Sequence, residues 1–293
     1  MFSRRHPYLF FILVFTLILC SSSVIISLVS GVSKISEKKT GKYNIGVIDI
    51  NGIIFESESV IENLKNFRER KDIEAVVLRI NSPGGGVAPS QEIYESVKRL
   101  KQKKKVVASL GSVAASGGYY IASAADKIVT NPGTITGSIG VIMEYTNIEE
   151  VMDKIGVSPV VIKSGKFKDT GSPTRPITDD EKKFLQDFVD KIHSQFVEDV
   201  ASGRKMDKEK VMEYADGRII SGSDAVLYGL ADMTGNFETA LDYTALEAGI
   251  KKNDYNLVYP PKEKFSFLRE VLSESVSKLS EVVFKNTNLM TLK

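Results

Sequence analysis

The sequence predicts an α/β domain in which a parallel sheet is flanked by helices. Short apolar runs alternate with amphipathic stretches through the middle of the chain, and this alternation is typical of parallel strands connected by helices. The chain has 293 residues, of which 42% are hydrophobic and 26% are charged, as in an ordinary folded enzyme. About 250 residues lie beyond the N-terminal segment, enough for one large domain with a buried core.

The first segment of the chain is predicted to be a membrane anchor. Residues 8–29 contain no charge, and this length suits a spanning helix of about 20 residues better than a cleavable signal with an apolar part of about 7–15 residues. We expect a leader and anchor at residues 1–30 and a linker at 31–42. Positive charges flank the anchor on both sides, so they do not set its orientation. Cys20 is the single cysteine, which excludes an intramolecular disulfide and leaves open whether this segment is retained, cleaved or lipidated.

The domain expected at residues 43–261 alternates strands and helices. Apolar runs predict the strands, and apolar side chains at helical spacing predict the helices. The expected strands are residues 43–50, 75–80, 105–110, 127–130 and 159–162. The expected short helices are residues 59–70, 91–101, 121–125, 223–228 and 237–248.

Two further helices are expected towards the C-terminal end of the chain. A long helix begins with a capping box formed by Thr178 and Glu181. Its apolar stripe consists of Phe184, Leu185, Phe188, Val189, Ile192, Phe196 and Val200. The tail at residues 262–293 is amphipathic, and its mixed polar side favours packing on the domain or on another subunit over a membrane surface.

A serine between a strand and a pair of glycines is the candidate nucleophile. Residues 112–120 read Ser-Val-Ala-Ala-Ser-Gly-Gly-Tyr-Tyr, so Ser116 lies where a β-rich run gives way to a helix of small residues. Backbone N–H groups at the start of a helix have no partner within it and point at whatever is bonded to such a serine. The sequence therefore predicts a reactive hydroxyl at this turn.

A glycine-rich turn about thirty residues earlier is the candidate oxyanion site. Residues 81–86 read Asn-Ser-Pro-Gly-Gly-Gly and follow an apolar strand. Glycine allows close approach of the backbone to a ligand, so its N–H groups can bind a developing oxyanion. Each motif alone is common in ordinary turns, whereas the two together indicate an acyl-transfer site. The neighbouring Val87, Val113 and Ile139 favour an extended hydrophobic peptide as the ligand.

The residue types do not decide which side chain is the general base. Of the two histidines, His6 lies in the leader, and His193 lies at the edge of an apolar stripe, where packing suits it better than catalysis. A Ser-His-Asp triad is therefore disfavoured. A lysine whose pKa is lowered by burial is the other base that can serve a serine. Lys163, Lys166 and Lys168 follow one apolar run, and nothing in their spacing chooses among them.

Six motifs of the chain resemble the signal peptide peptidase A (SppA) family of membrane-bound serine proteases, which have the Clp protease/crotonase fold. The resemblance runs from about residue 43 to residue 239. Its motifs are Asn-Ser-Pro-Gly-Gly-Gly (81–86), Gly-Ser-Val-Ala-Ala-Ser-Gly-Gly-Tyr-Tyr-Ile (111–121), Ala-Asp-Lys-Ile (125–128), Thr-Gly-Ser-Ile-Gly-Val (136–141), Lys-Ser-Gly-Lys-Phe-Lys-Asp (163–169) with Ser-Pro (172–173), and Ala-Asp-Gly-Arg (215–218). Because all six occur in the family's order, the resemblance is specific.

The resemblance implies a Ser-Lys dyad and assigns its members. Ser116 corresponds to the nucleophile and Lys168 to the general base, while Ser138 corresponds to the residue that orients the lysine amine. The backbone N–H groups of Gly85 and Gly117 correspond to the oxyanion hole. The implied reaction is acyl transfer through a serine ester, and it needs neither a metal nor another cofactor.

The resemblance also implies partners and a location. The family degrades released signal peptides, which are hydrophobic, and its single-copy members form homo-oligomeric rings or domes, so that nucleophile and base meet within or between subunits. It implies a single-pass protein of the cell (inner) membrane with the catalytic domain on the extracytoplasmic side. The net charge of +2 gives no reason to expect nucleic acid, and no Walker A or dinucleotide motif is present in the sequence.

Two other functions fit parts of the pattern. A crotonase-type enzyme acting on acyl-coenzyme A shares the fold and the oxyanion glycines but uses carboxylates as acid and base. A non-catalytic membrane scaffold could keep the fold without the chemistry. The turn around Ser116 argues against the first, and the presence of both Ser116 and Lys168 argues against the second.

Overall fold

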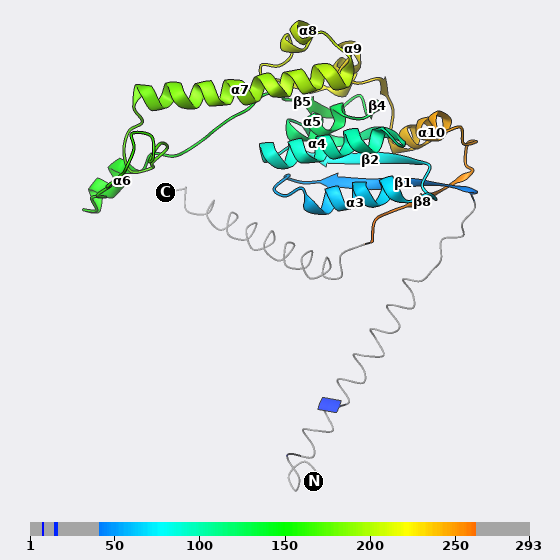
Figure 1. Ribbon diagram of the computed structural model, residues 1–293, viewed down its shortest axis with the longest axis horizontal. Helices are drawn as coiled ribbons and strands as arrows, with labels where there is room; N and C mark the ends of the chain where they lie inside the picture. The colour runs from blue at the N-terminus through cyan, green and yellow to red at the C-terminus, as the bar shows by residue number, and fades with distance from the viewer. Residues whose placement is uncertain (1–7, 9–14, 17–40, 262–293) are drawn as a thin grey trace, which may run out of the picture. The chain divides into compact units, whose positions relative to one another are not determined.

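The computed structural model describes residues 8, 15–16 and 41–261 (Figure 1). The chain divides into two compact units, and the fold below is that of the second, which begins at Tyr43. The predicted anchor and the predicted tail helix lie outside the described residues, apart from three isolated positions in the anchor. Within the described part of the chain, no helix combines the length and the apolar character that crossing a membrane requires.

One mostly parallel sheet forms the centre of the domain. Its strands in the described residues are β1 (Tyr43–Asn51), β2 (Ala75–Ser82), β3 (Lys105–Ala115), β4 (Lys127–Thr130), β5 (Ile135–Gly137), β6 (Ile219–Ser221), β7 (Met233–Thr234) and β8 (Tyr255–Val258). The main path runs β6-β5-β3-β2-β1-β8, with β4 paired to β3 and β7 paired to β4. Every pairing in this sheet is parallel except that of β5 with β6. The predicted parallel sheet is confirmed, with one antiparallel pair.

Helices cover both faces of this sheet. They are α3 (Glu58–Glu69), α4 (Val87–Lys101), α5 (Gly117–Ser123), α6 (Glu149–Lys154), α7 (Asp179–Arg204), α8 (Lys208–Met212), α9 (Gly222–Leu227) and α10 (Phe237–Glu247). The larger hydrophobic cluster joins α3, α4, α5 and the C-terminal half of α7 to one face, and a smaller cluster joins α10 to the other. The predicted α/β architecture with flanking helices is therefore confirmed.

The central strands are buried on both faces. On β2, Val76, Leu78 and Ile80 belong to the larger cluster, whereas Val77 between them belongs to the cluster with α10. Successive residues of a strand point to opposite faces, so a strand covered on both sides is apolar at most of its positions. This is why the runs at β1, β2 and β3 are recognisable as strands in the sequence.

The predicted strand at residues 159–162 is wrong. Val160 and Ile162 are 88% and 97% exposed, and no strand of the described sheet pairs with this run. Its apolar composition resembles a buried strand, but a single chain offers it no neighbour. Figure 1 shows the segment between β5 and α7 extending beyond the sheet at the N-terminal end of α7.

Several elements differ in extent from those predicted, among them α5, which begins at Gly117 and not at residue 121. β3 continues to Ala115, so the strand leads directly into Ser116, and α4 begins at Val87, directly after the glycine turn. The strands β5 to β8 and the helices α6 and α8 were not predicted. The capping box at the start of α7 is confirmed, since the side chain of Thr178 accepts from the N–H of Glu181 and the side chain of Glu181 accepts from the N–H of Thr178.

Candidate active site

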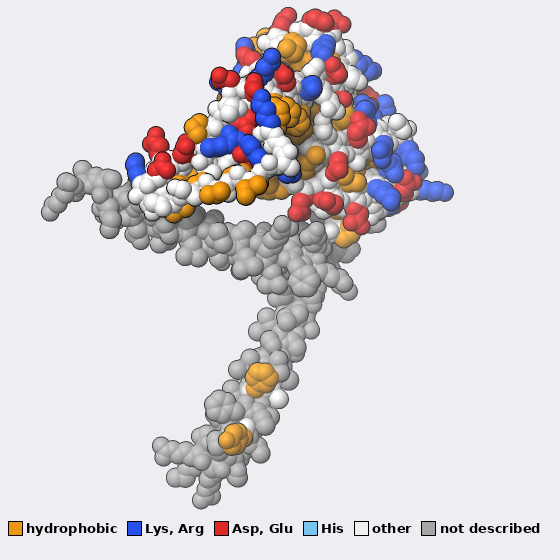
Figure 2. Space-filling model, turned by 60° about the vertical axis from the view of Figure 1, so that its left-hand side comes forward, with side chains coloured by type: hydrophobic (Ala, Val, Ile, Leu, Met, Phe, Trp, Pro, Cys, Tyr) orange, Lys and Arg blue, Asp and Glu red, His pale blue; other side chains and the backbone are white. Residues whose placement is uncertain are grey.

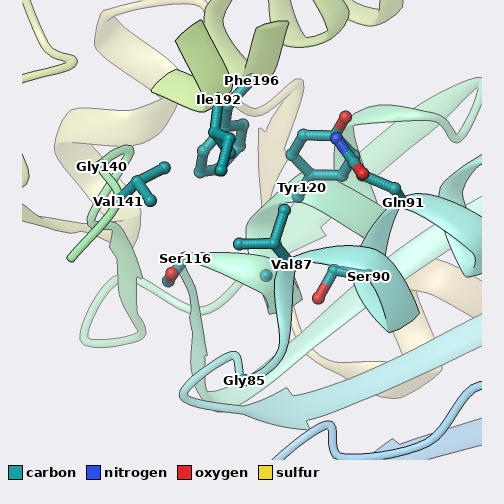
Figure 3. Close-up of a pocket in the computed structure, with 11 residues that line it drawn as sticks. Gly85, Val87, Ser90, Gln91, Ser116, Tyr120, Gly140, Val141, Ile192 and Phe196 are labelled. Atoms are coloured by element: carbon teal, nitrogen blue, oxygen red, sulfur yellow. The ribbon is translucent and has the colours of Figure 1, made fainter. Parts of the chain in front are cut away.

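Ser116 occupies the junction between β3 and α5. Its φ and ψ angles are 52° and −122°, a combination that glycine adopts readily and other residues rarely do. Its N–H donates to the carbonyl of Gly137 at 2.9 Å, and its carbonyl accepts from the N–H of Tyr120 at 2.8 Å. Strained backbone of this kind persists where the surrounding structure fixes it, often at functional sites. The side chain of Ser116 is half-buried at the edge of a pocket (Figure 3).

The glycine turn approaches Ser116 through Gly84 and Gly85. Gly84 has a φ of +99°, and a side chain there would lie 2.7 Å from the nitrogen of Gly117 and 2.9 Å from the Cβ of Ser116. A side chain at Gly85 would lie 2.2 Å from the carbonyl oxygen of Ile54. Both contacts are too close for any other residue without a shift of the backbone. The two motifs that the sequence separates by about thirty residues are therefore in contact.

The N–H groups of Gly85 and Gly117 are both available for a ligand. Gly85 forms a parallel bridge with Ile54, and this bridge uses the N–H groups of Ile54 and Gly86. The N–H of Gly85 therefore faces away from Ile54. Gly117 is the first residue of α5, where no acceptor exists within the helix. Neither N–H donates to an acceptor in the described residues, so both can bind an oxyanion.

A small apolar pocket lies over Ser116. Figure 3 shows the side chains of Val87, Val141, Ile192 and Phe196 converging on it. Its volume is about 30 Å³, which is room for one or two water molecules. Of the three apolar residues that sequence analysis placed near a peptide site, Val87 lines this pocket, whereas Ile139 is buried in the core and Val113 is not part of the lining.

Tyr120 and the helix α7 are parts of the pocket that sequence analysis missed. The hydroxyl of Tyr120 donates to the carboxylate of Asp199 on α7, and its ring packs on Phe196 with centroids 4.6 Å apart. Burial and this carboxylate raise the pKa of Tyr120, so the phenol stays neutral and holds α7 over the pocket. The apolar stripe of α7 contained the signal for Phe196, but nothing marked Ser90 or Gln91, which also line the pocket.

Ser138 lies next to the bond that holds Ser116. It follows β5 directly, with a φ of 49°, and its N–H donates to the carbonyl of Arg218 at 2.8 Å. The residue before it, Gly137, accepts the hydrogen bond from the N–H of Ser116. The two serines with catalytic assignments are therefore linked through main-chain atoms, and both have the positive φ that side chains disfavour.

The three candidate lysines differ in their ion pairs. The amine of Lys163 lies 2.5 Å from a carboxylate oxygen of Asp169, and Lys166 pairs with Asp180. Lys168 is exposed, and among the described residues its amine has neither an ion pair nor a hydrogen bond. It does not line the pocket of the candidate nucleophile. A single chain therefore does not bring the predicted nucleophile and base together.

No other base takes the place of Lys168 at the pocket. Among its lining residues, all of which are described, there is no lysine, histidine, aspartate or glutamate. His193 is half-buried on α7, and its Nε2 atom is buried without a hydrogen bond. In the described part of the chain, no cluster of three or more His, Cys, Asp or Glu residues is arranged to hold a metal ion.

Comparison with protein families decides the classification. A family model for peptidase family S49 matches residues 98–251, and a model for Clp protease matches residues 48–134. The chain belongs to peptidase family S49. The two matches overlap on the segment that contains Ser116, and the other residues that line the pocket lie in one match or the other. The resemblance to SppA serine proteases predicted from the motifs is confirmed.

Relatives of this S49 chain carry protease names. The chain is 44% identical over 222 residues to slr0021 of Synechocystis, which is named as a protease, and the match covers 75% of the chain and 80% of that protein. It is 37% identical over 220 residues to an Enterococcus faecium protein named after signal peptide peptidase SppA, with 70% and 64% covered. It is 34% identical over 209 residues to the chloroplast serine protease SPPA of Arabidopsis thaliana, with 71% and 31% covered. The chain thus spans less than two thirds of the last two relatives.

The family membership narrows the chemistry of the pocket to that of a serine protease. S49 is a peptidase family, and its Arabidopsis relative is named as a serine protease. The S49 match includes Ser116, Ser138 and Lys168, and the glycine turn lies in the Clp protease match. All residues that the resemblance assigns therefore lie within the two matched segments, although no base lines the pocket of the single chain.

Proposed function

We propose that this S49 protease cleaves hydrophobic peptides, in particular released signal peptides, with Ser116 as nucleophile. The observation that carries the proposal is the strained turn that presents Ser116 beside the N–H groups of Gly85 and Gly117, neither of which has an acceptor in the described residues. The Ser116 oxygen attacks the peptide carbonyl, and the two N–H groups bind the resulting oxyanion. The apolar lining of the pocket supports a hydrophobic substrate.

Lys168 is the general base in this proposal, and it comes from a second copy of the chain. The pocket of one chain contains no base, and Lys168 is exposed without a partner among the described residues. The amine takes the proton of the Ser116 hydroxyl and returns it to the leaving amine of the peptide. A water molecule then hydrolyses the ester and regenerates the serine. Ser138 orients the lysine amine.

Exposed apolar side chains support the second copy. The segment between β5 and α7 exposes Ile142 by 88% and Ile162 by 97%, and Phe184 and Phe188 on α7 are 49% and 47% exposed. Figure 2 brings this end of the molecule forward and shows hydrophobic side chains at the surface between charged ones. Exposed apolar area of this kind is typical of interaction sites, including interfaces between proteins. A second copy that covers it also removes water from Lys168, and burial favours a neutral amine.

The membrane location is part of the same proposal. The uncharged run at residues 8–29 would hold the protein in the inner membrane with the protease domain on the extracytoplasmic side, close to the signal peptides that remain there. Deletion of residues 1–30 should release the protein from the membrane fraction and leave peptide cleavage in solution intact. Retention of the deleted form in membranes would contradict the anchor.

Mixed assemblies test the proposed dyad. With a synthetic hydrophobic signal peptide, Ser116→Ala and Lys168→Ala should each abolish cleavage. Assembled together in equal amounts, they should recover about a quarter of the wild-type activity, because that fraction of neighbouring pairs holds both intact residues when one subunit supplies the serine and the next the lysine. Inactivity of the mixture would contradict a site shared between subunits, and activity of either variant alone would contradict its role.

The acyl-coenzyme A alternative has less support. A crotonase-type reaction needs carboxylates as acid and base, and none lines the pocket, which consists entirely of described residues. Labelling of wild-type protein, but not of Ser116→Ala, by a fluorophosphonate serine probe would separate the two functions.

A further inference from the structure

We propose that Arg175 is a positioning residue that fixes the turn carrying Lys168 onto the N-terminus of α7. The inference rests on the proposed function, in which Lys168 is the general base. It concerns a residue that does not line the Ser116 pocket and that acts only through the placement of its neighbours.

All five N–H donors of the Arg175 guanidinium are used. Nε donates to a carboxylate oxygen of Asp169 at 3.0 Å, and Nη2 donates to the main-chain carbonyl of Asp169 at 3.2 Å. Nη1 and Nη2 donate to the two carboxylate oxygens of Glu181, and Nη1 also donates to the carbonyl of Pro176 at 3.0 Å. A planar guanidinium provides five donors in fixed directions. Arg175 therefore holds Asp169 and Glu181 at set positions relative to each other.

The carboxylates on either side of Arg175 are well covered. The side chain of Glu181 is 3% exposed and that of Asp169 is 14% exposed. Carboxylates withdrawn from water in this way need charged partners, and removal of one partner leaves a charge uncompensated. The cluster of Arg175, Asp169 and Glu181 therefore forms a joint with a fixed geometry. The pair of Lys166 and Asp180 differs from it, because its side chains are 63% and 66% exposed.

Lys168 depends on this joint because no helix or strand supports it. Residues 155–178 contain no regular element. Around Lys168 the backbone forms successive turns, in which the N–H of Lys168 donates to Gly165 at 3.2 Å and the N–H of Ser172 donates to Asp169 at 3.0 Å. Arg175 donates hydrogen bonds to both the carboxylate and the main-chain carbonyl of Asp169, the residue that follows Lys168. The direction in which the lysine leaves the turn is thus set by Arg175.

The joint also connects the lysine turn to the helix that covers the serine pocket. Glu181 belongs to the capping box of α7, and Ile192 and Phe196 further along α7 line the pocket. Glu181 and Ile192 are 11 residues apart in this helix, about 16 Å along its axis. The turn that contains Lys168 therefore lies at the N-terminal end of α7, and the Ser116 pocket lies further along the same helix. Subunits that pair through α7 would present each Lys168 in a reproducible place.

The same cluster distinguishes Lys168 from its neighbours. Asp169 accepts from both Arg175 and Lys163, so Lys163 is bound inside the joint. Lys166 is paired with Asp180. Among the three lysines that the sequence could not separate, Lys168 is the one whose amine has no partner in the described residues. Because Lys163 and Lys166 are paired with carboxylates, Lys168 is the one of these three lysines whose amine is left to reach a second copy of the chain.

Kinetics of Arg175→Gln and Arg175→Lys in the full-length protein test the inference. Both variants should lower kcat by about 100-fold, the effect of a misplaced catalytic group, and should leave KM nearly unchanged, because the peptide pocket is intact. Rates are to be expressed per active site titrated with an acylating ester. This normalisation removes any loss caused by unfolded protein. Arg70→Gln is the matched control, because Arg70 also pairs with an aspartate, Asp72, at 2.6 Å but lies far from Lys168 in the sequence.

Hydrogen exchange gives a second readout that does not depend on cleavage. In both Arg175 variants, amides of residues 163–175 should exchange faster, while those of β2 and β3 keep their protection. Unchanged exchange in this segment, or a wild-type kcat per titrated site in both variants, would overturn the inference. Activity that survives Lys168→Ala would instead overturn the proposed function, and the exchange measurement would still report whether Arg175 fixes the turn.

Discussion

The N–H of Ser116 donates a hydrogen bond of 2.9 Å to the carbonyl of Gly137, the residue before Ser138. This bond belongs to the pairing of β3 with β5, which continues the sheet on one side of the candidate nucleophile. This bond joins the turn with the candidate nucleophile to the turn with the proposed lysine-orienting serine. A substitution that shifts the backbone of the Ser116 turn should therefore also shift the backbone of the Ser138 turn, and the reverse.

Ser116→Gly should stabilise the fold while it abolishes cleavage. Glycine adopts the φ of 52° without strain, so the free energy of unfolding should rise by about 1 kcal/mol relative to Ser116→Ala. Urea unfolding of the two variants measures the difference. Ser112→Gly is the control on the same strand, where glycine should lower stability by about 0.5–1 kcal/mol. Equal stability of Ser116→Gly and Ser116→Ala would contradict strain at the turn.

Gly85→Ala should lower the rate of peptide cleavage by about 100-fold or more, because it displaces one oxyanion donor. The added methyl would lie 2.2 Å from the carbonyl oxygen of Ile54, so the loop must shift. Gly133→Ala is the matched control, since a side chain there meets nothing within 4 Å. Steady-state kinetics with a hydrophobic peptide measure the effect. Similar rates for the two variants would show that the N–H of Gly85 has no part in catalysis.

The ion pairs of Asp169 predict a dependence of stability on acid. Hydrogen bonds from Arg175 and Lys163 lower the pKa of Asp169 from 3.8 to about 2. Because the folded pKa lies below the unfolded one, the stabilisation is complete above about pH 4 and is lost as the pH falls towards 2. Thermal unfolding midpoints measured from pH 5 to pH 2 should fall less steeply for Asp169→Asn than for the wild type. The exposed Asp153 on α6 provides the control, Asp153→Asn. Parallel curves for Asp169→Asn and the wild type would refute the prediction.

Charges on the exposed apolar surface should weaken self-association. Ile162→Asp and Phe184→Asp place a carboxylate where a second copy is proposed to pack, so sedimentation velocity should show smaller species and peptide cleavage should fall. Their unfolding midpoints should stay close to that of the wild type, because Ile162 is 97% exposed in a single chain. Leu246→Asp on α10, at a residue 71% exposed, is the control. Association unaffected by both charges would place the interface elsewhere.

The sequence predicts the core of the fold because the central strands are apolar on both faces. The run from Val76 to Ile80 could only be a buried strand or a short piece of buried helix, and the glycine turn after it decides for a strand. The turn at Ser116 was equally recognisable, since a serine followed by Gly117 and Gly118 at the end of an apolar run has few alternatives. These features are local, and a local pattern suffices to predict them.

Features that depend on contacts between distant parts of the chain could not be predicted from local sequence patterns. The apolar run at residues 159–162 resembles a strand by composition, but the residues of a single chain provide no partner for it. The hydroxyl of Tyr120 donates to Asp199, which lies 79 residues further along the chain on α7. The choice among Lys163, Lys166 and Lys168 depends on Asp169 and Asp180 as neighbours in space, and spacing along the chain does not reveal which amine each carboxylate holds.

The absence of any lysine, histidine or carboxylate from the lining of the Ser116 pocket has a consequence for the cell. In the proposed assembly, a subunit that has not yet met a second copy has Ser116 without a base, so it should not cleave the proteins around it. Under this proposal, hydrolysis should rise more steeply than in proportion to the amount of protein, and dilution of the assembly into single subunits should abolish it. The quaternary structure would then do the work that a removable propeptide does in many other proteases.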